Sequence, residues 1–533
     1  MKIEFVGGAK SVTGSSYIIK DDDFTIMIDC GMFQGSKELK ERNALDLIYN
    51  PGKIDSLILT HAHIDHSGLI PKLVKNGFYG NIYATQATAD LCTIMLPDSA
   101  HIQEMDTKWI NKKRKKLDLE PTEPLYTADD AVKSLSNFVP VNYGDTIQIN
   151  PRVHIRFRDA GHILGSSFVE MWIDEGDKKT KIVFSGDIGQ KESAIIRDPD
   201  IVEDADILLL ESTYGDRLHK SKEDTETEFI SIINETHKGP GNIVIPSFAI
   251  ERTQEIIYLL SKLFRSGKIP VIPVYIDSPL AISATEIFKK NSDCFDDEIK
   301  QIFSSGESPL DFPSLRFVRT TADSKKLNDE ASGAIIISAS GMCNAGRIKY
   351  HLMNNLYRPE SSVVFVGYQA DGTLGRRLVE GARQVRIYGE DVIVRAKIHT
   401  LGGFSAHADK NGLLEWAGKI NNPKLRVFVI HGEGEASTSL ADELRTRYGF
   451  TTHVPDWGEI VDLETMKTEV ASYAVADTFT SLDRDIESLA EIISTINEKY
   501  KRAKNENKIK KIKHLQEDIN DAKQMLAMII DEL

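Results

Sequence analysis

The chain has 533 residues, of which 41% are hydrophobic and 27% charged, so a fibrous or wholly disordered protein is excluded and more than one domain is expected. A formal net charge of −15 argues against nonspecific nucleic-acid binding by the whole surface, although a local basic channel is compatible with it. The four cysteines form no CxxC pair, and no apolar run approaches the roughly 20 residues that span a bilayer, so we expect a cytoplasmic protein without disulfides or membrane contact.

The N-terminal segment predicts a β-hairpin followed by a third strand. Residues 2–6 and 16–20 flank the small-residue run 7–14, and residues 24–29 end in Asp29-Cys-Gly. Glycines after a strand end let the backbone pass close to a site. We therefore expect Asp29 to point toward the loop that follows the next strand; a plain strand-end aspartate is the alternative.

That next strand, residues 56–59, runs into His61-Ala-His-Ile-Asp-His66, which places three histidines and an aspartate within six positions. Residues 68–74 begin a helix, so the polar side chains lie on a strand-to-helix loop. Imidazoles and a carboxylate suit zinc, and their clustering would be costly without an ion. The loop therefore predicts a metal site at His61, His63, Asp65 and His66. A solvated polar loop is the alternative.

A basic run, residues 112–116, follows the segment Asp98-Ser-Ala-His-Ile-Gln-Glu104. Such a run is usually a solvated face. Contact with phosphates is the alternative, and it gains weight only if the substrate is a nucleic acid.

Three later strand ends carry further polar side chains. His162 and Asp187 each lie between glycines at the end of an apolar run, and Glu211 follows the strand of residues 205–210. Ordinary strand ends favour generic turn residues over recurrent Asp and His. We therefore expect these three side chains to join the same site.

From about residue 213 strands and helices alternate, which predicts a parallel sheet in a second α/β unit. Its loops at 246–252, 277–280, 338–342 and 367–375 follow strand ends and should line a cleft. Near residue 397 the chain returns to polar strand-end loops, at His407 and His431. The second unit is therefore an insertion.

Past residue 461 the pattern becomes helical. An apolar heptad stripe runs from Leu482 to Leu533, interrupted by the polar residues 501–507. We interpret this tail as a helical hairpin that either covers the chain's own core or forms a homodimer.

These motifs together resemble the β-CASP ribonucleases of the metallo-β-lactamase superfamily. Within this group, the sequence most resembles the prokaryotic relatives of the endonuclease subunit of cleavage and polyadenylation specificity factor. Three motifs carry this resemblance: Gly7-Gly-Ala-Lys-Ser-Val-Thr-Gly-Ser15, Asp98-Ser-Ala-His-Ile-Gln-Glu104 and Phe404-Ser-Ala-His-Ala-Asp409. The resemblance implies an α/β fold, namely a four-layer αββα metallo-β-lactamase sandwich with an inserted α/β (β-CASP) domain of mainly parallel sheet. The predicted domains are 1–212 and 397–462 for the sandwich, 213–396 for the insertion and 463–533 for the helical tail.

The resemblance also implies a role for each polar residue. It assigns one zinc to His61, His63 and His162, and a second zinc to Asp65, His66 and His431, with Asp187 as the bridge. Two such metals activate water for attack on a phosphodiester. The implied proton donor to the leaving oxygen is His407, held by Glu211, and Asp29 would orient a ligand histidine. The predicted catalytic residues are Asp65, Glu211 and His407.

DNA-directed members of the group typically lack the last histidine, so His431 favours RNA. The resemblance thus implies a zinc-dependent RNA-processing nuclease, cutting internally, with two zinc ions per chain. Cleft-loop residues are candidates for substrate contacts, and surface salt bridges are the alternative for each arginine. These candidates are Arg252, Ser340, Arg347 and Arg376.

Two other functions compete with this hypothesis. A small-molecule (thio)ester or lactam hydrolase would use the same zinc site, but it needs only a pocket lid rather than a whole inserted domain. A non-catalytic RNA-binding scaffold would tolerate the loss of ligand residues, and in this sequence every expected ligand position is intact.

Overall fold

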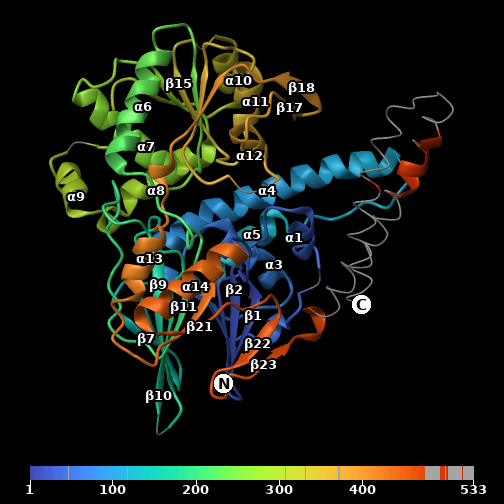
Figure 1. The fold of residues 1–533 in the computed structure, drawn as a ribbon, viewed down its shortest axis with the longest axis vertical. Helices are drawn as coiled ribbons and strands as arrows, with labels where there is room; N and C mark the ends of the chain where they lie inside the picture. Colours follow the sequence, from blue (N-terminus) through green and yellow to red (C-terminus); the bar gives the residue numbers. More distant parts are fainter. Residues whose placement is uncertain are drawn as a thin grey trace. The chain divides into compact units, whose positions relative to one another are not determined.

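The computed structural model of the chain describes residues 1–45, 47–116, 118–176, 178–306, 308–330, 332–369, 372–474, 493–498, 500–501 and 519. It divides into two compact units, Met1–Glu469 and Val470–Leu533. Most of the predicted heptad stripe between Leu482 and Leu533 lies outside the described residues, so the helical hairpin and the homodimer stay predictions. The first unit carries most of the strands and helices (Figure 1).

Two large sheets form the body of this unit. The first has eight strands in the order β23-β22-β1-β2-β3-β4-β5-β6. Its β1 and β2 form the predicted antiparallel hairpin, whereas β3 to β6 run parallel to one another. The bounds are β1 Lys2–Gly7, β2 Ser16–Lys20, β3 Thr25–Ile28, β4 Ser56–Ile58, β5 Asn81–Thr85, β6 Phe138–Val141, β22 Glu459–Asp462 and β23 Thr468–Val470.

The second sheet has seven strands in the order β21-β20-β11-β10-β9-β8-β7. Strands β7 to β10 are antiparallel neighbours, and β10, β11, β20 and β21 run parallel. The bounds are β7 Thr146–Asn150, β8 Val153–Asp159, β9 Ser167–Asp174, β10 Lys179–Phe184, β11 Ile207–Glu211, β20 Arg426–Ile430 and β21 Thr451–His453.

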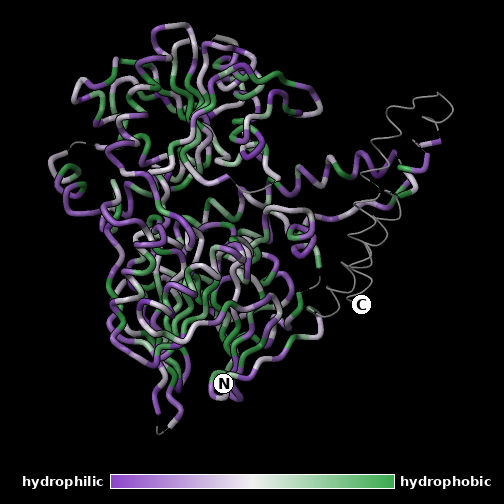
Figure 2. Tube along the Cα trace, in the orientation of Figure 1, coloured by the Kyte–Doolittle hydropathy of each residue, from purple (hydrophilic) through white to green (hydrophobic). Residues whose placement is uncertain are grey.

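The core lies between the two sheets. Alternate side chains of both sheets, such as Phe5 and Phe157, are fully buried in one apolar cluster. Burial of each such large side chain stabilises the fold by roughly 1.5–3 kcal/mol. Figure 2 shows the same pattern as hydrophobic strand segments in the interior.

Helices cover the outer faces of both sheets. A second cluster packs the other face of the seven-stranded sheet against α13 (Lys410–Ala417) and α14 (Gly434–Tyr448). The helix α5 (Ala128–Ser134) contacts both α3 (Ile70–Lys75) and α4 (Gln86–Lys116), and α4 also contacts β5 and β6 of the eight-stranded sheet. The layers therefore run helix, sheet, sheet, helix, which confirms the predicted αββα sandwich.

The inserted unit has a six-stranded sheet in the order β14-β13-β15-β12-β16-β19, and all its neighbouring strands are parallel, as predicted. Its last strand, β19, lies just after the predicted domain boundary at residue 396. A separate hairpin, β17 (Gln384–Ile387) and β18 (Glu390–Ile393), stands beside it. The sheet strands are β12 Ile243–Pro246, β13 Val274–Ile276, β14 Leu315–Phe317, β15 Ile335–Ser338, β16 Ser362–Phe365 and β19 Lys397–Thr400.

In the inserted unit, N-terminal caps and the spacing of apolar residues explain where the helices form. In α6, Ser221 caps the first turn by accepting a hydrogen bond from the Asp224 N–H, and Phe229, Ile232 and Ile233 share the buried face. The helices are α6 Lys222–Thr236, α7 Arg252–Arg265, α8 Pro279–Lys290, α9 Asp297–Ser304, α10 Thr321–Glu330, α11 Ile348–Asn355 and α12 Leu374–Val379. Two shorter helices belong to the sandwich, α1 Lys37–Arg42 and α2 Ile64–Ser67.

The tail begins later than the predicted boundary at residue 462, because β23 adds an edge strand to the eight-stranded sheet. Among the described residues, none of the helices combines the length and the apolar character that crossing a bilayer requires.

Candidate metal centre

The polar residues predicted from the strand ends meet at one edge of the sandwich. Asp29 follows β3, the histidine loop follows β4 and enters α2, and His162 lies between β8 and β9. The second sheet, to which β8 and β9 belong, also supplies Asp187 after β10, Glu211 at the end of β11 and His431 after β20. His407 joins them through a β-bridge to Gly189. Residues from 29 to 431 are thus gathered by the topology of the two sheets.

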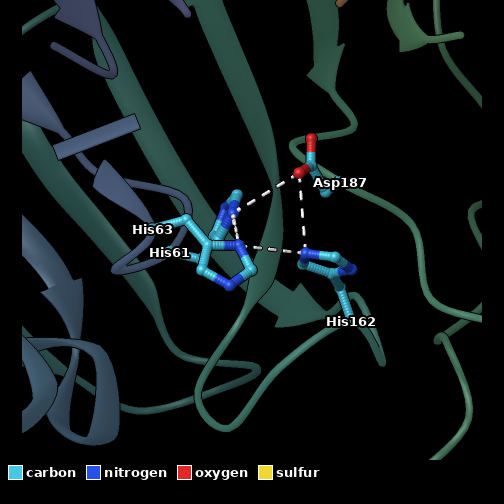
Figure 3. Close-up of side chains that lie close together, drawn as sticks. All are labelled: His61, His63, His162 and Asp187. Atoms are coloured by element: carbon cyan, nitrogen blue, oxygen red, sulfur yellow. Dashed lines mark hydrogen bonds and ion pairs between the residues drawn. The ribbon is translucent and has the colours of Figure 1, made fainter. Parts of the chain in front are cut away.

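Four side chains form a first set of metal-ligating atoms, shown pointing toward one another in Figure 3. The Nδ1 atom of His63 lies 3.1 Å from Nε2 of His61 and 3.2 Å from Nε2 of His162. The Oδ2 atom of Asp187 lies 3.5 Å from the His61 nitrogen and 3.6 Å from the His162 nitrogen. A regular tetrahedron with its corners about 2.0–2.1 Å from a central zinc has edges of about 3.3–3.4 Å. The set therefore fits a tetrahedrally bound ion.

The protonation of this set also suits a metal. Burial, reinforced by the neighbouring His66, holds the pKa of His61 well below its usual range. Burial likewise lowers the pKa of His63 to about 4 and lowers that of His162 strongly. Metal ligation requires neutral imidazoles, and these three are neutral at physiological pH.

A second set consists of Asp65, His66 and His431. The two Nε2 atoms of His66 and His431 lie 3.2 Å apart, and Nε2 of His431 lies 3.7 Å from Oδ2 of Asp65. The other oxygen of Asp187, Oδ1, lies 3.3 Å from His66 Nε2, and among the described residues no hydrogen-bond donor satisfies it. One carboxylate thus faces both sets, with one oxygen toward each.

The backbone around the second set is held by close contacts. Gly31 follows the β3 strand end, and a Cβ atom there would lie only 1.7 Å from the carbonyl oxygen of Asp65. The N–H groups of Ser15 and Cys30 donate to the carbonyls of Asp65 and His66, and the His431 N–H donates to the Gly8 carbonyl at 2.6 Å. The predicted close approach of the glycine segments to the site is therefore observed.

Asp29 orients His66. Its Oδ2 lies 2.7 Å from His66 Nδ1, so that the Nε2 of the same ring faces the cluster. Thr60 holds the carboxylate in turn, since its N–H and hydroxyl donate to the two Asp29 oxygens at 2.8 and 2.9 Å. Burial opposes the charged form of His66, but Asp187 and Asp29 outweigh it and raise its pKa well above the ordinary value.

His407 lies beside the donor sets rather than in them. Its Nδ1 is 3.3 Å from Oε1 of Glu211, which also accepts a hydrogen bond from the Ile188 N–H at 2.7 Å. Burial opposes a charged imidazole, yet the carboxylates of Glu211, Asp187 and Asp65 together raise the pKa of His407 to about 9. Bound cations would offset part of this rise.

A cleft of about 650 Å³ joins the cluster to the inserted unit. Its wall includes His162, residues 403–406 just before His407, and residues of α7 from Arg252 to Lys262. The remaining predicted substrate-contact residues lie outside this wall.

Each predicted arginine has a carboxylate partner within the protein. Arg252 pairs with Glu255, Arg347 with Asp277 and Arg376 with Glu380, at 2.5–2.6 Å. Ser340 shares hydrogen bonds with the backbone of Ala345. Contact of these side chains with substrate stays a prediction. Each arginine can bind a phosphate only in addition to its carboxylate partner or in place of it.

Two supporting residues were missed in the sequence. Thr60 was recognisable as the hydroxyl residue directly before the histidine loop. Glu251 was not, since its role depends on a contact between the inserted unit and the sandwich: its Oε2 accepts a hydrogen bond from the Leu164 N–H at 2.9 Å, two residues after His162.

Three family models match successive parts of the chain. Residues 11–117 match the metallo-β-lactamase superfamily, residues 253–378 the Beta-Casp domain, and residues 391–455 the Zn-dependent metallo-hydrolase RNA specificity domain. The matched segments correspond to the first sheet with α4, the parallel-sheet insertion, and the return to His407 and His431.

Curated relatives extend the match to most of the chain. Ribonuclease TTHA0252 of Thermus thermophilus is 36% identical over 447 residues, which cover 84% of this chain and 96% of that protein. Transcription termination factor FttA of Thermococcus kodakarensis is 31% identical, covering 86% and 70%, and that of Methanosarcina mazei is 29% identical, covering 88% and 71%. The chain therefore belongs to the β-CASP group of the metallo-β-lactamase superfamily and is a metal-dependent hydrolase.

Proposed function

We propose that the chain is a zinc-dependent endoribonuclease that holds two zinc ions and hydrolyses RNA phosphodiester bonds. Its similarity to a ribonuclease and to transcription termination factors supports RNA as the substrate. The observation that best supports two ions is the Asp187 carboxylate, which turns one oxygen toward each donor set. His61, His63 and His162 would hold one ion, and Asp65, His66 and His431 the other.

Zinc ions bound there would supply charge neutralisation at the phosphate and a water molecule of lowered pKa. The protein's own contribution begins with Asp29, which fixes the tautomer and direction of His66. His407 is the proton donor in this proposal. The carboxylate of Glu211 favours its charged form, and a protonated imidazole beside the cluster can donate to the leaving 3′ oxygen.

The cleft supports a polymeric substrate. It extends from His162 to α7 of the inserted unit, so a chain can lie along it with one phosphate at the cluster. A small-molecule (thio)esterase or lactamase would require only a closed pocket over the metal site. A non-catalytic scaffold would not require His407 beside Glu211.

Linear and circular RNA of the same sequence, digested side by side with purified protein and zinc, test this proposal. We expect both to be cut, and the first circular product to be a full-length linear molecule. Cleavage of linear RNA alone would replace the endonuclease with an exonuclease. Absence of cleavage of either RNA, together with hydrolysis of a thioester or lactam, would contradict the RNA substrate.

A further inference from the structure

The distal half of α4 presents an open face. Thr122 bonds to Asn111, and the Glu120 carbonyl accepts from Arg114, so the segment after α4 returns along that side of the helix. Met105 and Trp109 lie on the other side at helical spacing and are 52% and 60% exposed. Large apolar side chains held in the open on a surface helix indicate a contact surface.

The distal half of α4 is strongly basic. Residues 105–116 contain six lysines and arginines against one acidic residue, Asp106, in a chain whose net charge is −15. The Lys113 ammonium lies 3.4 Å from the centre of the Trp109 ring, a cation–π contact on the surface. Figure 2 shows the distal part of α4 as largely hydrophilic. Positive charge is thus concentrated where the aromatic ring is exposed.

A second exposed aromatic group lies on the inserted unit. Tyr350 of α11 and Tyr388 are 51% and 52% exposed, their ring centres are 4.9 Å apart, and the rings are inclined by 31°. The Lys349 ammonium lies 4.3 Å from the centre of the Tyr388 ring. This group repeats the combination found at Trp109, an open ring with a lysine over it.

Tyr388 has an unusual backbone conformation. With Gly389 it forms the two-residue turn between β17 and β18, and both residues have positive φ, +52° and +90°. Asn-Gly is the favoured pair in such a turn, because a side chain at positive φ costs roughly 1–2 kcal/mol except in glycine and, to a smaller extent, Asn or Asp. An exposed tyrosine held at that cost indicates a use for its ring.

Asp106 of α4 links the two groups electrostatically, because its carboxylate acts on both Lys349 and Tyr388. Burial lowers the pKa of Lys349, and the Asp106 carboxylate of α4 acts in the opposite direction. Burial, Tyr350 and the same carboxylate raise the pKa of Tyr388 to about 12. Asp106 neighbours Trp109 on the helix surface, three positions away.

We propose that Trp109, Lys113, Lys349, Tyr350 and Tyr388 form a platform that binds single-stranded RNA outside the catalytic cleft. Bases stack on the exposed rings, and the lysines of α4 and Lys349 neutralise phosphates. Exposed aromatic rings interleaved with basic side chains are the common means of holding single strands without sequence preference. This inference rests on the proposed function, because the strand held on the platform is the one cut at the metal centre.

The platform predicts a length dependence. The hydroxyls of Thr85, at the end of β5, and Thr88, in the first turn of α4, donate to the carbonyl of Gly165, three residues after His162. From Thr88 to Trp109 the helix rises about 32 Å at 1.5 Å per residue. A strand stacked at about 3.4 Å per nucleotide needs roughly ten nucleotides to cover that distance. Only longer RNAs reach both places.

Steady-state cleavage of two RNAs with the same cut site, about 6 and about 30 nucleotides long, tests the platform in the full-length zinc-loaded protein. The variants are Tyr388→Asn, which suits the turn and removes the ring, and Trp109→Ala. Each should raise KM for the long RNA about tenfold, with kcat and all values for the short RNA unchanged. Tyr79→Ala, at an 87% exposed tyrosine outside the platform, is the control and should change nothing.

Fluorescence anisotropy with the long RNA separates the two proposals. If wild-type protein cuts neither RNA but binds the long one, and the variants weaken that binding, the platform stands and the proposed function fails. Equal KM values for wild type and both variants on the long RNA overturn the platform. A shift in oligomeric state of either variant, without an effect on RNA, assigns the surface to a protein contact and also overturns it.

Discussion

Two buried polar clusters lie at the carboxyl ends of strands in this protein, and they differ in their balance of donors and acceptors. In the inserted unit, Oδ1 of Asp277 accepts from Arg347 at 2.6 Å, and Oδ2 meets His351 Nε2 at 2.7 Å and the Ser324 hydroxyl at 2.5 Å. In the sandwich, imidazole nitrogens face one another at 3.1–3.2 Å, and among the described residues Asp187 Oδ1 has no donor.

The difference distinguishes a structural network from a metal centre. A carboxylate whose oxygens are satisfied by protein donors needs nothing further and stabilises the loops that supply them. Facing nitrogens, in contrast, can share at most one proton per pair, and a buried acceptor without a donor costs free energy. A bound cation removes that cost. The two clusters should therefore respond in opposite ways to substitution and to metal.

The largest effect is expected for Asp187→Asn. The amide keeps the shape of the side chain but loses the charge that faces both donor sets. We expect activity to fall about 10⁴-fold or more, because the metal ions and their several kcal/mol of charge stabilisation are lost. Kinetics and metal analysis of the same preparation measure this. Full metal content with near-normal activity would mean that the two donor sets do not share Asp187.

His407→Ala should leave the metal content unchanged and lower the rate about 10²- to 10⁴-fold, as expected for the loss of a general acid. An RNA in which sulfur replaces the leaving 3′ oxygen needs little protonation. This substrate should recover most of the rate in the variant and gain little in wild type. Loss of a metal ion, or no recovery with sulfur, would assign His407 to a different role.

Glu211→Gln sharpens that test through its pH dependence. The carboxylate favours the protonated form of His407, whose pKa is raised to about 9. Activity that requires this proton is present below the pKa and declines as the pH rises through it. Removing the charge lowers the pKa, so the decline should begin at lower pH in the variant. An unchanged alkaline limb in the pH–rate profile would mean that Glu211 does not raise the pKa of the proton donor.

Asp29→Ala should have a smaller effect, a loss of about 10- to 100-fold in metal affinity, because Asp29 orients His66 without belonging to either donor set. Competition with a chelator measures it. Asp23→Ala, at an exposed aspartate remote from the cluster, is the control. If Asp29→Ala has no effect on metal affinity, the orientation of His66 depends on packing alone.

Asp277→Asn should alter stability and not metal content. Loss of the charged hydrogen bonds is expected to lower the free energy of unfolding by roughly 1.5–3 kcal/mol near neutral pH. Burial opposes the charge, but bonds from His351, Ser324 and Arg347 hold the pKa of Asp277 below its ordinary value. The stabilisation is therefore present above about pH 4 and disappears as the pH falls through the lowered pKa. Denaturant unfolding at several pH values should show the variant and wild type converge in acid; a constant difference would contradict this.

Local patterns predicted much of this molecule. The strand predicted at 16–20 has the expected bounds, because its apolar run and the small residues before it lie within one short segment. The histidine loop was recognisable since metal ligands from one loop are adjacent in sequence. The parallel sheet followed from the alternation of strand and helix.

Other features depend on contacts that no local pattern contains. The carboxylate partners of Arg252 and Arg347 became visible only in the fold, as did the hydrogen bond from the Leu164 N–H to Glu251. The edge strands β22 and β23 pair with a sheet that begins more than 450 residues earlier, at Lys2. Tyr388 gave no signal as a turn residue, because its ring contradicts the usual turn composition.

The most direct test of the central claim is the metal content of the purified protein. Protein prepared without added metal, then dialysed and analysed by mass spectrometry, should contain two zinc ions per chain. The Asp277→Asn variant should contain the same number and Asp187→Asn fewer. A folded, active protein with one zinc ion or none would contradict the assignment of two donor sets that share Asp187.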